Sequence, residues 1–434
     1  MESRERNVPP QYQEGDVKNA LARIEGHSYE QGEWQDIRYE FGNAGHLLGS
    51  AWVALEHDGT RILFSGDLGG RSGHLPAIAD PPAADVLFLE STYGDTLTHP
   101  SFSDARTKVF QAAVDAATDG VPVLIPTFGM GRAQELLQVF RERESQLPEE
   151  IPLVFDGLIE DSMNVYHAFA SDSWINDIIL NYKINSGDTT PFLPDRAEKP
   201  DTVDSREEVV NGEQAPIIIS PSGMLTGGWA PWYLWRFTQH YQDARVLFVG
   251  YQAENTPGRQ LLEEPSGTAD VTISALMYPE QADRPRAEIL SERGSEKAPD
   301  EIETRANQHF DFYEKTIGVP TAWARRVSGL SGHADANTLL QFARAAEPGQ
   351  IQLVHGEPAV AEQLREHIAA NADAEAVRVA EPREAIDVTA TGAVIDARDE
   401  LERLKSERNV LKQSLSELSD RIDSLEQRLE DLEE

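Results

Sequence analysis

Seven short apolar runs, separated by segments with helical spacing, constrain the fold of this chain more than any other feature. Each has the length of a buried strand: Arg61–Ser65, Val86–Glu90, Val121–Pro126, Pro152–Asp156, Pro216–Ser220, Arg245–Gly250 and Gln352–His355. The helical segments are Ser103–Thr118, Arg132–Arg143, Glu160–Ala170 and Ala230–Tyr241. Strands that alternate with helices pair into largely parallel sheets with helices on their faces. The alternation therefore predicts an α/β fold.

One pair of strands departs from this alternation. Ala51–Leu55 and Arg61–Phe64 flank an Asp58-Gly59 dipeptide, which is a strong signal for a tight hairpin turn. We therefore expect a β-hairpin here and a mixed or antiparallel sheet around it. Further along, Gln281–Asn307 is charged and contains two prolines, and we expect it to be a surface insertion.

The charge balance is strongly acidic. The 434 residues include 38 lysines and arginines against 75 aspartates and glutamates, which gives a formal net charge of −37. Such a lysine-poor, acidic surface favours a protein that lives in concentrated salt, because screening there makes self-repulsion tolerable. The alternatives are an ordinary acidic protein or one that avoids nucleic acid. An RNA partner would have to meet a local basic patch.

Two absences narrow the chemistry and the location. The chain has no cysteine, so disulfides, thiolate nucleophiles and cysteine-ligated zinc are excluded, and a transition-metal site must use histidines and carboxylates. No apolar run reaches the roughly 18 residues that span a bilayer, and residues 1–16 lack the apolar stretch of a signal peptide. We therefore expect a cytoplasmic protein with no membrane partner.

A heptad pattern occupies the C-terminal segment. The a positions are Leu401, Arg408, Leu415, Ile422 and Leu429, and the d positions are Leu404, Leu411, Leu418, Leu425 and Leu432. The flanking pairs Glu407–Lys412, Arg421–Glu426 and Arg428–Glu433 are each of opposite sign. This pattern favours a parallel two-stranded coiled coil, and so a homodimer, over one long amphipathic helix lying on the globular body.

Five short segments place a histidine or an acidic residue among small residues. They are Asn43–Ala51, Phe64–Gly70, Leu89–Asp95, Leu330–Asp335 and Leu353–Glu357, and they carry His46, Asp67, Glu90, His333 and His355. Four of them lie at or just after the end of an expected strand, where an α/β sheet gathers a site. Taken singly, each such residue is more often structural. Five in one chain indicate a metallohydrolase centre, since neutral histidines with a carboxylate suit Zn²⁺.

As a set and in this order, these segments closely resemble the β-CASP group of the metallo-β-lactamase superfamily. This RNA- and DNA-cleaving group includes cleavage-and-polyadenylation endonucleases and RNase J enzymes. The resemblance runs from about Pro10 to Ile395 and includes Pro126–Leu137, Ser220–Gly228 and Gly250–Leu262. It implies an αββα sandwich with an inserted α/β domain. The lactamase domain would comprise residues 1–97 and 268–396, the β-CASP domain residues 98–267, and the coiled coil residues 397–434.

The resemblance also assigns roles. His46, Asp67 and His355 match metal ligands, with Asp67 bridging two zinc ions that hold a hydroxide in line with the phosphorus. Glu90 and His333 match an acid–histidine pair that donates a proton to the phosphate or the leaving oxygen. Single-stranded RNA would be held by Ser222, Gly223, Met224, Arg132, Arg259, Arg325 and Arg326. For the arginines, ion pairing with the abundant carboxylates is an equal alternative.

The sequence departs from the family in one respect. The signature His-x-His-x-Asp-His, which supplies four of seven metal-binding side chains, should precede His46 and is absent, as are the opening strands of the lactamase sheet. One interpretation is that Met1 is not the true start and the full product is an ordinary dizinc nuclease. The other is a non-catalytic paralogue that binds RNA or an active partner subunit. We favour the former, because all the later motif residues, from His46 to His355, are present. We disfavour a small-molecule metallohydrolase, because it would lack the inserted domain.

We predict that a chain ending at Asp396 is a monomer, because it lacks the five a–d layers of the heptad segment. Sedimentation equilibrium of this chain and of the 434-residue chain would test the point. A shortened chain that still sedimented as a dimer would contradict the assignment.

Overall fold

The computed structural model describes residues 14–171, 174–277, 311–381 and 383. The heptad segment and the expected insertion Gln281–Asn307 lie outside these residues, so both stay predictions. Among the described residues, no helix is long and apolar enough to cross a membrane.

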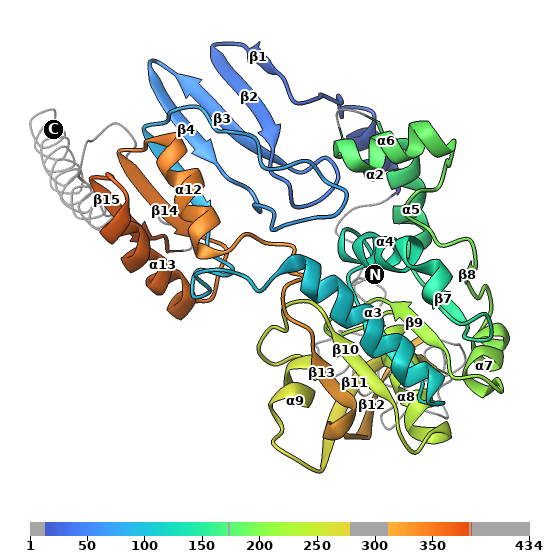
Figure 1. Ribbon diagram of the computed structural model, residues 1–434. Coiled ribbons are helices and arrows are strands. Elements are labelled where there is room, and N and C mark those ends of the chain that lie inside the picture. The colour runs from blue at the N-terminus through green and yellow to red at the C-terminus, as the bar shows by residue number, and fades with distance from the viewer. Residues whose placement is uncertain (1–13, 172–173, 278–310, 382, 384–434) are drawn as a thin grey trace, which may run out of the picture.

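The first unit is a seven-stranded sheet in the order β1-β2-β3-β4-β5-β14-β15 (Figure 1). Its strands are β1 (Gln31–Trp34), β2 (Ile37–Asn43), β3 (Ala51–His57), β4 (Thr60–Phe64), β5 (Val86–Glu90), β14 (Gln350–Val354) and β15 (Ala376–Val379). The strands β1 to β4 pair antiparallel, and β4, β5, β14 and β15 pair parallel. The expected mixed sheet is confirmed, and the turn at Asp58 and Gly59 has positive φ at both residues.

Helices α12 (Ala336–Ala346) and α13 (Pro358–Asn371) cover this sheet. Leu63, Leu87 and Ile351 of the strands pack with Leu339 and Leu364 of the helices in one buried cluster. Two facing sheets are expected for a complete αββα sandwich, whereas the described residues of this unit form one continuous sheet. The reason is the parallel pairing of β4 with β5, which joins the antiparallel part to the parallel part.

The second unit is a parallel six-stranded sheet in the order β13-β10-β6-β9-β7-β8. Its strands are β6 (Val123–Pro126), β7 (Leu153–Phe155), β8 (Ala197–Glu198), β9 (Ile217–Ser220), β10 (Arg245–Phe248) and β13 (Ala324–Arg326). Its helices are α3 (Phe102–Thr118), α4 (Arg132–Glu142), α5 (Ile159–Ala168), α6 (Asp177–Ser186), α7 (Val203–Asn211), α8 (Ala230–His240) and α9 (Pro257–Glu263).

Both faces of this second sheet are buried. On β6, Val123 and Ile125 pack in the cluster that contains Val109 of α3 and Leu136 of α4, whereas Leu124 packs in the cluster of α8. Successive side chains of a strand point to opposite faces of the sheet, and here both faces pack against helices. Every residue of such a strand is therefore buried, which explains the continuous apolar runs in the sequence.

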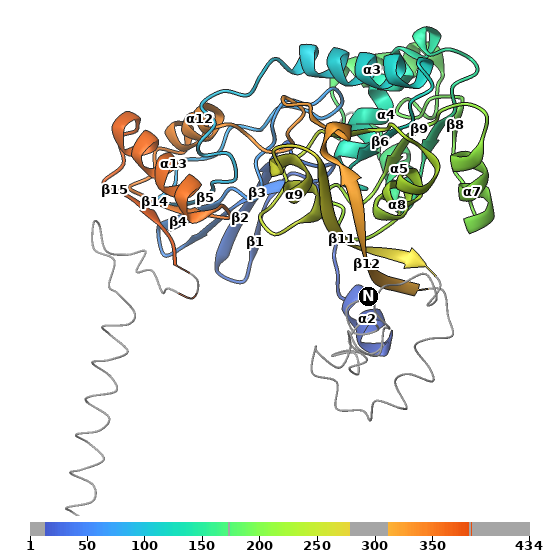
Figure 2. The same cartoon turned by 90° about the horizontal axis from the view of Figure 1, so that it is seen from below.

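A long hairpin, β11 (Thr268–Met277) with β12 (Asp311–Pro320), packs against α8 and α9. Figure 2 shows it on the side of the second unit opposite to α3. After it, β13 pairs with β10, so the chain up to Arg326 still belongs to the second sheet. The domain boundary expected at residue 267 stays a prediction, but the change of sheet occurs later in the chain.

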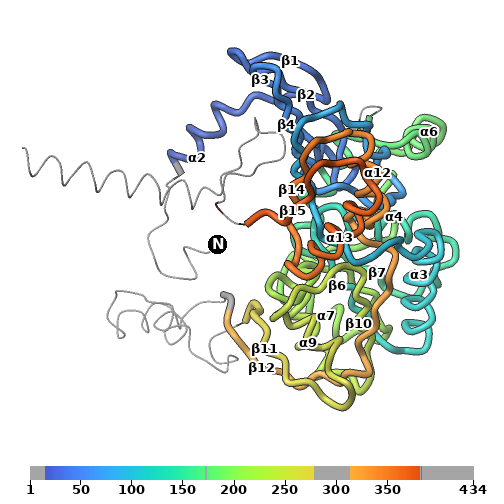
Figure 3. The backbone as a smooth tube through the Cα atoms, turned by 90° about the vertical axis from the view of Figure 1, so that its left-hand side faces the viewer, coloured from blue at the N-terminus to red at the C-terminus, as the bar shows by residue number. Residues whose placement is uncertain are grey.

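The two units lie side by side, with the first sheet and α12 above and the second sheet below in the view of Figure 3. Helix α2 (Glu14–Leu21) stands apart from both sheets. Two segments connect the units: one leads from β5 to α3 and the other from β13 to α12.

The second unit contains a buried ion pair whose loss we predict to be costly. Asp156 is fully buried. It accepts two hydrogen bonds of 2.6 Å from Arg206 and one of 2.8 Å from the Tyr233 hydroxyl. Asp156→Ala leaves the Arg206 charge buried without its partner, and we expect the free energy of unfolding to fall by about 3–5 kcal/mol.

Urea unfolding at constant salt would measure this loss. The matched control is Lys199→Ala, which removes a surface pair with Glu160 and should cost no more than about 1 kcal/mol. Equal effects of the two substitutions would contradict the prediction.

Candidate functional site

The ends of four strands gather the predicted site residues. Strands β2, β4, β5 and β14 run in the same direction, because β2 and β4 are both antiparallel to β3 and the others are parallel to β4. Their carboxyl ends therefore meet at one edge of the sheet. His46 follows β2, Asp67 follows β4, Glu90 ends β5 and His355 follows β14.

His333 joins this group from the loop before α12. Its ring centroid lies 4.4 Å from that of His46 and 5.7 Å from that of His355. Its Nδ1 lies 3.2 and 3.1 Å from the two carboxylate oxygens of Glu90. Nδ1 of His355 lies 3.1 Å from Oδ1 of Asp67. The structure thus brings together the five residues that the sequence predicts to share a site.

Glu90 holds several parts of the site in place. Its side chain is buried, with 1% exposure, and accepts hydrogen bonds from the backbone N–H of Leu68 (2.7 Å) and of Thr92 (3.3 Å) as well as contacting His333. A buried carboxylate needs such partners, since an unpaired charge in the interior is very costly. Glu90 therefore fixes the loop after β4 and orients the ring of His333.

The ring of His46 is set for metal binding. Its Nδ1 lies 2.9 Å from the carbonyl oxygen of Gly332, and because a carbonyl only accepts, Nδ1 carries the hydrogen. Burial, with the charge of His333 as a second cause, lowers the pKa of His46. The neutral form therefore presents the Nε2 lone pair, which is the form that ligates a metal.

The residues present fit a divalent ion. One ligand atom each from His46, Asp67 and His333 lies within 4.8 Å of the others, and the same holds for Glu90, His333 and His355. Three protein ligands from histidine and carboxylate are usual for catalytic zinc. Both groups contain His333, which therefore lies close enough to serve as a ligand or as a proton donor.

Glycines allow the loops of the site to approach one another. A Cβ at Gly69 would lie 1.9 Å from the carbonyl oxygen of Gly45, and one at Gly70 would lie 2.8 Å from that of His333. Gly69 forms a backbone bridge with His333, and the Gly70 N–H donates to the carbonyl of Gly332. The small residues of the sequence motifs thus let the loops that carry His46, Asp67 and His333 pack backbone to backbone.

A cavity of about 870 Å³ opens in front of this cluster. The first unit lines it with His46, Asp67, His333 and His355 among others, and the second unit with Phe128, Met130, Arg132, Met224 and Tyr251 among others. The cavity therefore lies between the two units, where a bound strand would contact both.

The residues predicted to hold nucleic acid are only partly at this cavity. Met224 and Arg132 line it, and Gly223 and Ser222 precede Met224 in the same loop. Arg132 is buried, and its Nη1 donates to the carbonyls of Leu330 (3.0 Å) and Ser331 (3.3 Å), so it also fastens the loop before His333.

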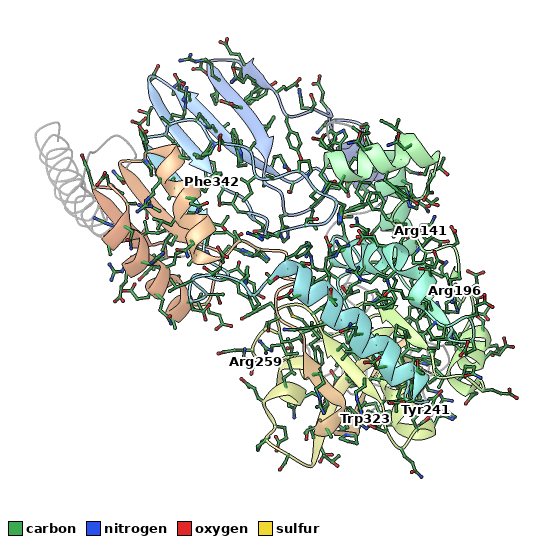
Figure 4. The ribbon with its side chains drawn as sticks, viewed as in Figure 1. Arg141, Arg196, Tyr241, Arg259, Trp323 and Phe342 are labelled. Carbon is green, nitrogen blue, oxygen red and sulfur yellow. The ribbon has the colours of Figure 1, made fainter. Side chains whose placement is uncertain are left out.

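The other three arginines lie outside the lining of this cavity. Arg259 lies on α9 at the edge of the second unit and pairs with Glu263 at 2.6 Å (Figure 4). Arg325 and Arg326 are exposed at β13. For Arg259 the structure thus contains the carboxylate pairing named above as the alternative to phosphate binding.

A contact between the two units across the cavity was not predicted from the sequence. The hydroxyl of Tyr251, in the second unit, donates to Glu357 of the first unit, and its ring meets Tyr93 edge to face at 6.0 Å. Burial and the hydrogen bond to Glu357 raise the pKa of Tyr251, so it stays a donor. The only sequence signal is their position: Tyr93 and Glu357 lie within three residues of Glu90 and His355 respectively.

An α/β fold with histidines and carboxylates at its strand ends, facing a cavity shared by two units, is that of a metallohydrolase-type protein. Residues 133–261 match the family model of the Beta-Casp domain, and residues 319–379 match that of the Zn-dependent metallo-hydrolase RNA specificity domain. The chain belongs to the β-CASP group of the metallo-β-lactamase superfamily, as the sequence motifs predicted.

Known relatives are archaeal and bacterial. An RNase J-like protein of Methanocaldococcus jannaschii is 34% identical over 264 residues, which cover 59% of each chain. The transcription termination factor FttA of the same organism is 29% identical over 332 residues, 74% of this chain and 45% of that protein. A ribonuclease of Thermus thermophilus is 28% identical over 346 residues, 79% of this chain and 68% of that protein. The chain thus spans about half the length of the two archaeal relatives.

A second buried carboxylate ties the loop after Asp67 to the inserted unit. Glu135 of α4 accepts from the Ser72 hydroxyl and the Gly73 N–H, both at 3.0 Å, and lies 3.3 Å from Nδ1 of His74. Burial alone would raise the pKa of Glu135, but the hydrogen bond and charge of His74, with the charges of two arginines, outweigh it and lower the pKa to about 2.

We predict that Glu135→Gln removes part of the acid sensitivity of the protein. A carboxyl whose pKa is lowered on folding stabilises the protein above its unfolded pKa, and this stability is lost as the pH falls from about 4.5 to about 2. Over this pH range, the wild type should lose about 3 kcal/mol more of its free energy of unfolding than the variant does. Denaturant unfolding between pH 2 and pH 7 would test this, and parallel pH profiles of variant and wild type would contradict it.

Proposed function

We propose that the protein is a metal-dependent ribonuclease that hydrolyses phosphodiester bonds in RNA processing or decay. The observation that carries the proposal is the cluster of His46, Asp67, His333 and His355 over the buried Glu90, facing a cavity between the two units. The matched RNA specificity domain and the ribonuclease-named relatives support RNA as the substrate.

In this proposal His46, Asp67 and His355 hold the metal. Zinc is the ion that the matched domain description names. The family resemblance implies two such ions, and Asp67 would be a ligand of both. A bound zinc ion supplies Lewis acidity, which activates water and neutralises charge on the phosphoryl oxygens. His46 is suited to this role by its hydrogen bond to Gly332, which leaves Nε2 free.

His333 and Glu90 handle the proton. Nδ1 of His333 donates to the buried carboxylate of Glu90, which orients the ring so that Nε2 is the atom left to act on the substrate. A donor at this place protonates the leaving oxygen as the phosphodiester bond breaks. Glu90 orients the histidine and does not touch the substrate itself.

Several finer features belong to the same proposal. The substrate is single-stranded RNA held by Met224, Arg132 and their neighbours, and mRNA 3′-end processing is the process that the family resemblance favours. The protein acts in the cytoplasm, as a homodimer through its heptad segment, and its acidic surface suits concentrated salt.

A second candidate is a non-catalytic RNA-binding or scaffolding subunit that assembles with an active paralogue. The observation that favours it is the ligand set, since this sequence contains no His-x-His-x-Asp-His. Among the described residues, each of the two possible metal-binding groups has three ligands, and both groups include His333. Metal analysis separates the two candidates, since well under two zinc ions per chain is expected of the second.

We predict that His333→Ala lowers the rate of RNA cleavage by about 10²–10⁴-fold, the usual contribution of a general acid. The zinc content should stay near that of the wild type, because His46, Asp67 and His355 remain. Single-turnover cleavage of end-labelled single-stranded RNA and metal analysis of the same preparations would measure both. His57→Ala, at a half-exposed histidine of the β3–β4 hairpin, is the matched control.

The outcomes are distinct. If zinc is lost together with activity, His333 is a ligand and the assignment of the proton donor is wrong. If a protein extended by the in-frame segment upstream of Met1, with added zinc, binds RNA but cuts neither end-labelled nor internally labelled RNA, the ribonuclease proposal fails and the non-catalytic subunit is favoured.

A further inference from the structure

A short loop of the second unit carries two exposed apolar side chains into the cavity. Phe128 and Met130 lie between β6 and α4, and their exposed fractions are 46% and 44%. Exposed apolar groups scattered singly on a surface need no explanation. Two of them two residues apart, both in the lining of the cavity that contains the metal cluster, indicate a binding surface.

This loop is held rigidly. The buried side chain of Gln134 accepts from the Gly131 N–H at 2.6 Å and donates to the Gly129 carbonyl at 3.1 Å, so it binds the loop on both sides of Met130. At the start of the loop, the Thr127 N–H donates to the carbonyl of Ser220 at 3.0 Å. A loop whose backbone is held in this way loses little conformational freedom when a ligand binds to its side chains.

The loop lies next to both the metal cluster and the loop that contains Met224. A Cβ at Gly131 would lie 2.3 Å from Cδ2 of Leu47 and 4.0 Å from the carbonyl oxygen of His46, which places the end of the loop beside the metal cluster. On the other side, a Cβ at Gly223 would lie 3.2 Å from the backbone nitrogen of Phe128. The loop from Thr127 to Gly131 thus lies between His46 and the loop that contains Met224.

The chemistry of this surface selects one part of a nucleic acid. Phe128, Met130, Met224 and Leu47 offer no hydrogen-bond donor and no strong acceptor, so they do not bind phosphate. A nucleobase has an apolar face of matching kind, and it lies one ribose away from its phosphate. Stacking of a base on an aromatic ring increases affinity roughly tenfold per base and tolerates every base.

We propose that Phe128 is the stacking platform for one nucleobase next to the scissile phosphate, with Met130 and Met224 beside it. The inference rests on the proposed function and specifies its substrate as unpaired, because a base within a duplex has no free face. The contact accepts every base, and purines are held more tightly than pyrimidines through their larger face.

A double-substitution experiment tests this assignment. A fluorescent single-stranded RNA of about ten nucleotides is prepared intact and with one abasic nucleotide placed at each position in turn. Binding to the 434-residue chain, with zinc replaced by a chelator to prevent cleavage, is followed by anisotropy. For the wild type, one abasic position should weaken binding by about tenfold.

For Phe128→Ala, the intact RNA should bind about tenfold more weakly, and the abasic substitution at that same position should cost nothing further. Phe128→Tyr should restore both the affinity and the abasic penalty. The matched control is Phe169→Ala, at a residue of the same unit that is 53% exposed and lies outside the cavity lining. It should behave as the wild type.

The failures are distinguishable. If the wild type binds RNA but Phe128→Ala keeps the full abasic penalty at every position, the stacking platform is excluded while the proposed function stands. If the wild type binds none of the RNAs, the proposed function fails and the platform with it.

Discussion

The interior of a protein tolerates a carboxylate only when hydrogen-bond donors surround it, and this requirement organises the site around Glu90. Its donors come from three separate segments: the loop after β4, the residues after β5, and the loop before α12. Satisfying one buried charge therefore brings Asp67 and His333 into register with the end of β5. The same interaction that stabilises the fold at this point also sets the geometry of the proposed chemistry.

A second constraint is the direction in which the strands of the first sheet run. Because β2, β4, β5 and β14 share one direction, their carboxyl ends deliver His46, Asp67, Glu90 and His355 to one edge, and loops rich in glycine let these ends close on one another. The inserted unit then completes the cavity from the opposite side. Arg132 and Glu135, at the start of α4, bind the loops before His333 and after Asp67, so the two units are joined at the site itself.

The sequence predicted the parts of the fold that depend on local pattern. The strand Val86–Glu90 has the expected bounds, the Asp58-Gly59 hairpin forms, and the five motif residues come together, because residue type and strand position carry that information. The β11–β12 hairpin was missed although Thr268–Met277 alternates in burial, since its partner lies beyond residues 278–310. Contacts between units, such as Arg132 with Leu330 or Tyr251 with Glu357, have no local signal and needed the structure.

The bond between His333 and Glu90 joins residues 243 positions apart, and the whole second unit lies between them in the chain. Closing a loop of that length is entropically unfavourable until the intervening chain has folded and brought its own ends together. We therefore expect the pair to form after the inserted unit has folded. A chain whose second unit is misfolded would then lack the contact between His333 and Glu90 on which the proposed chemistry depends.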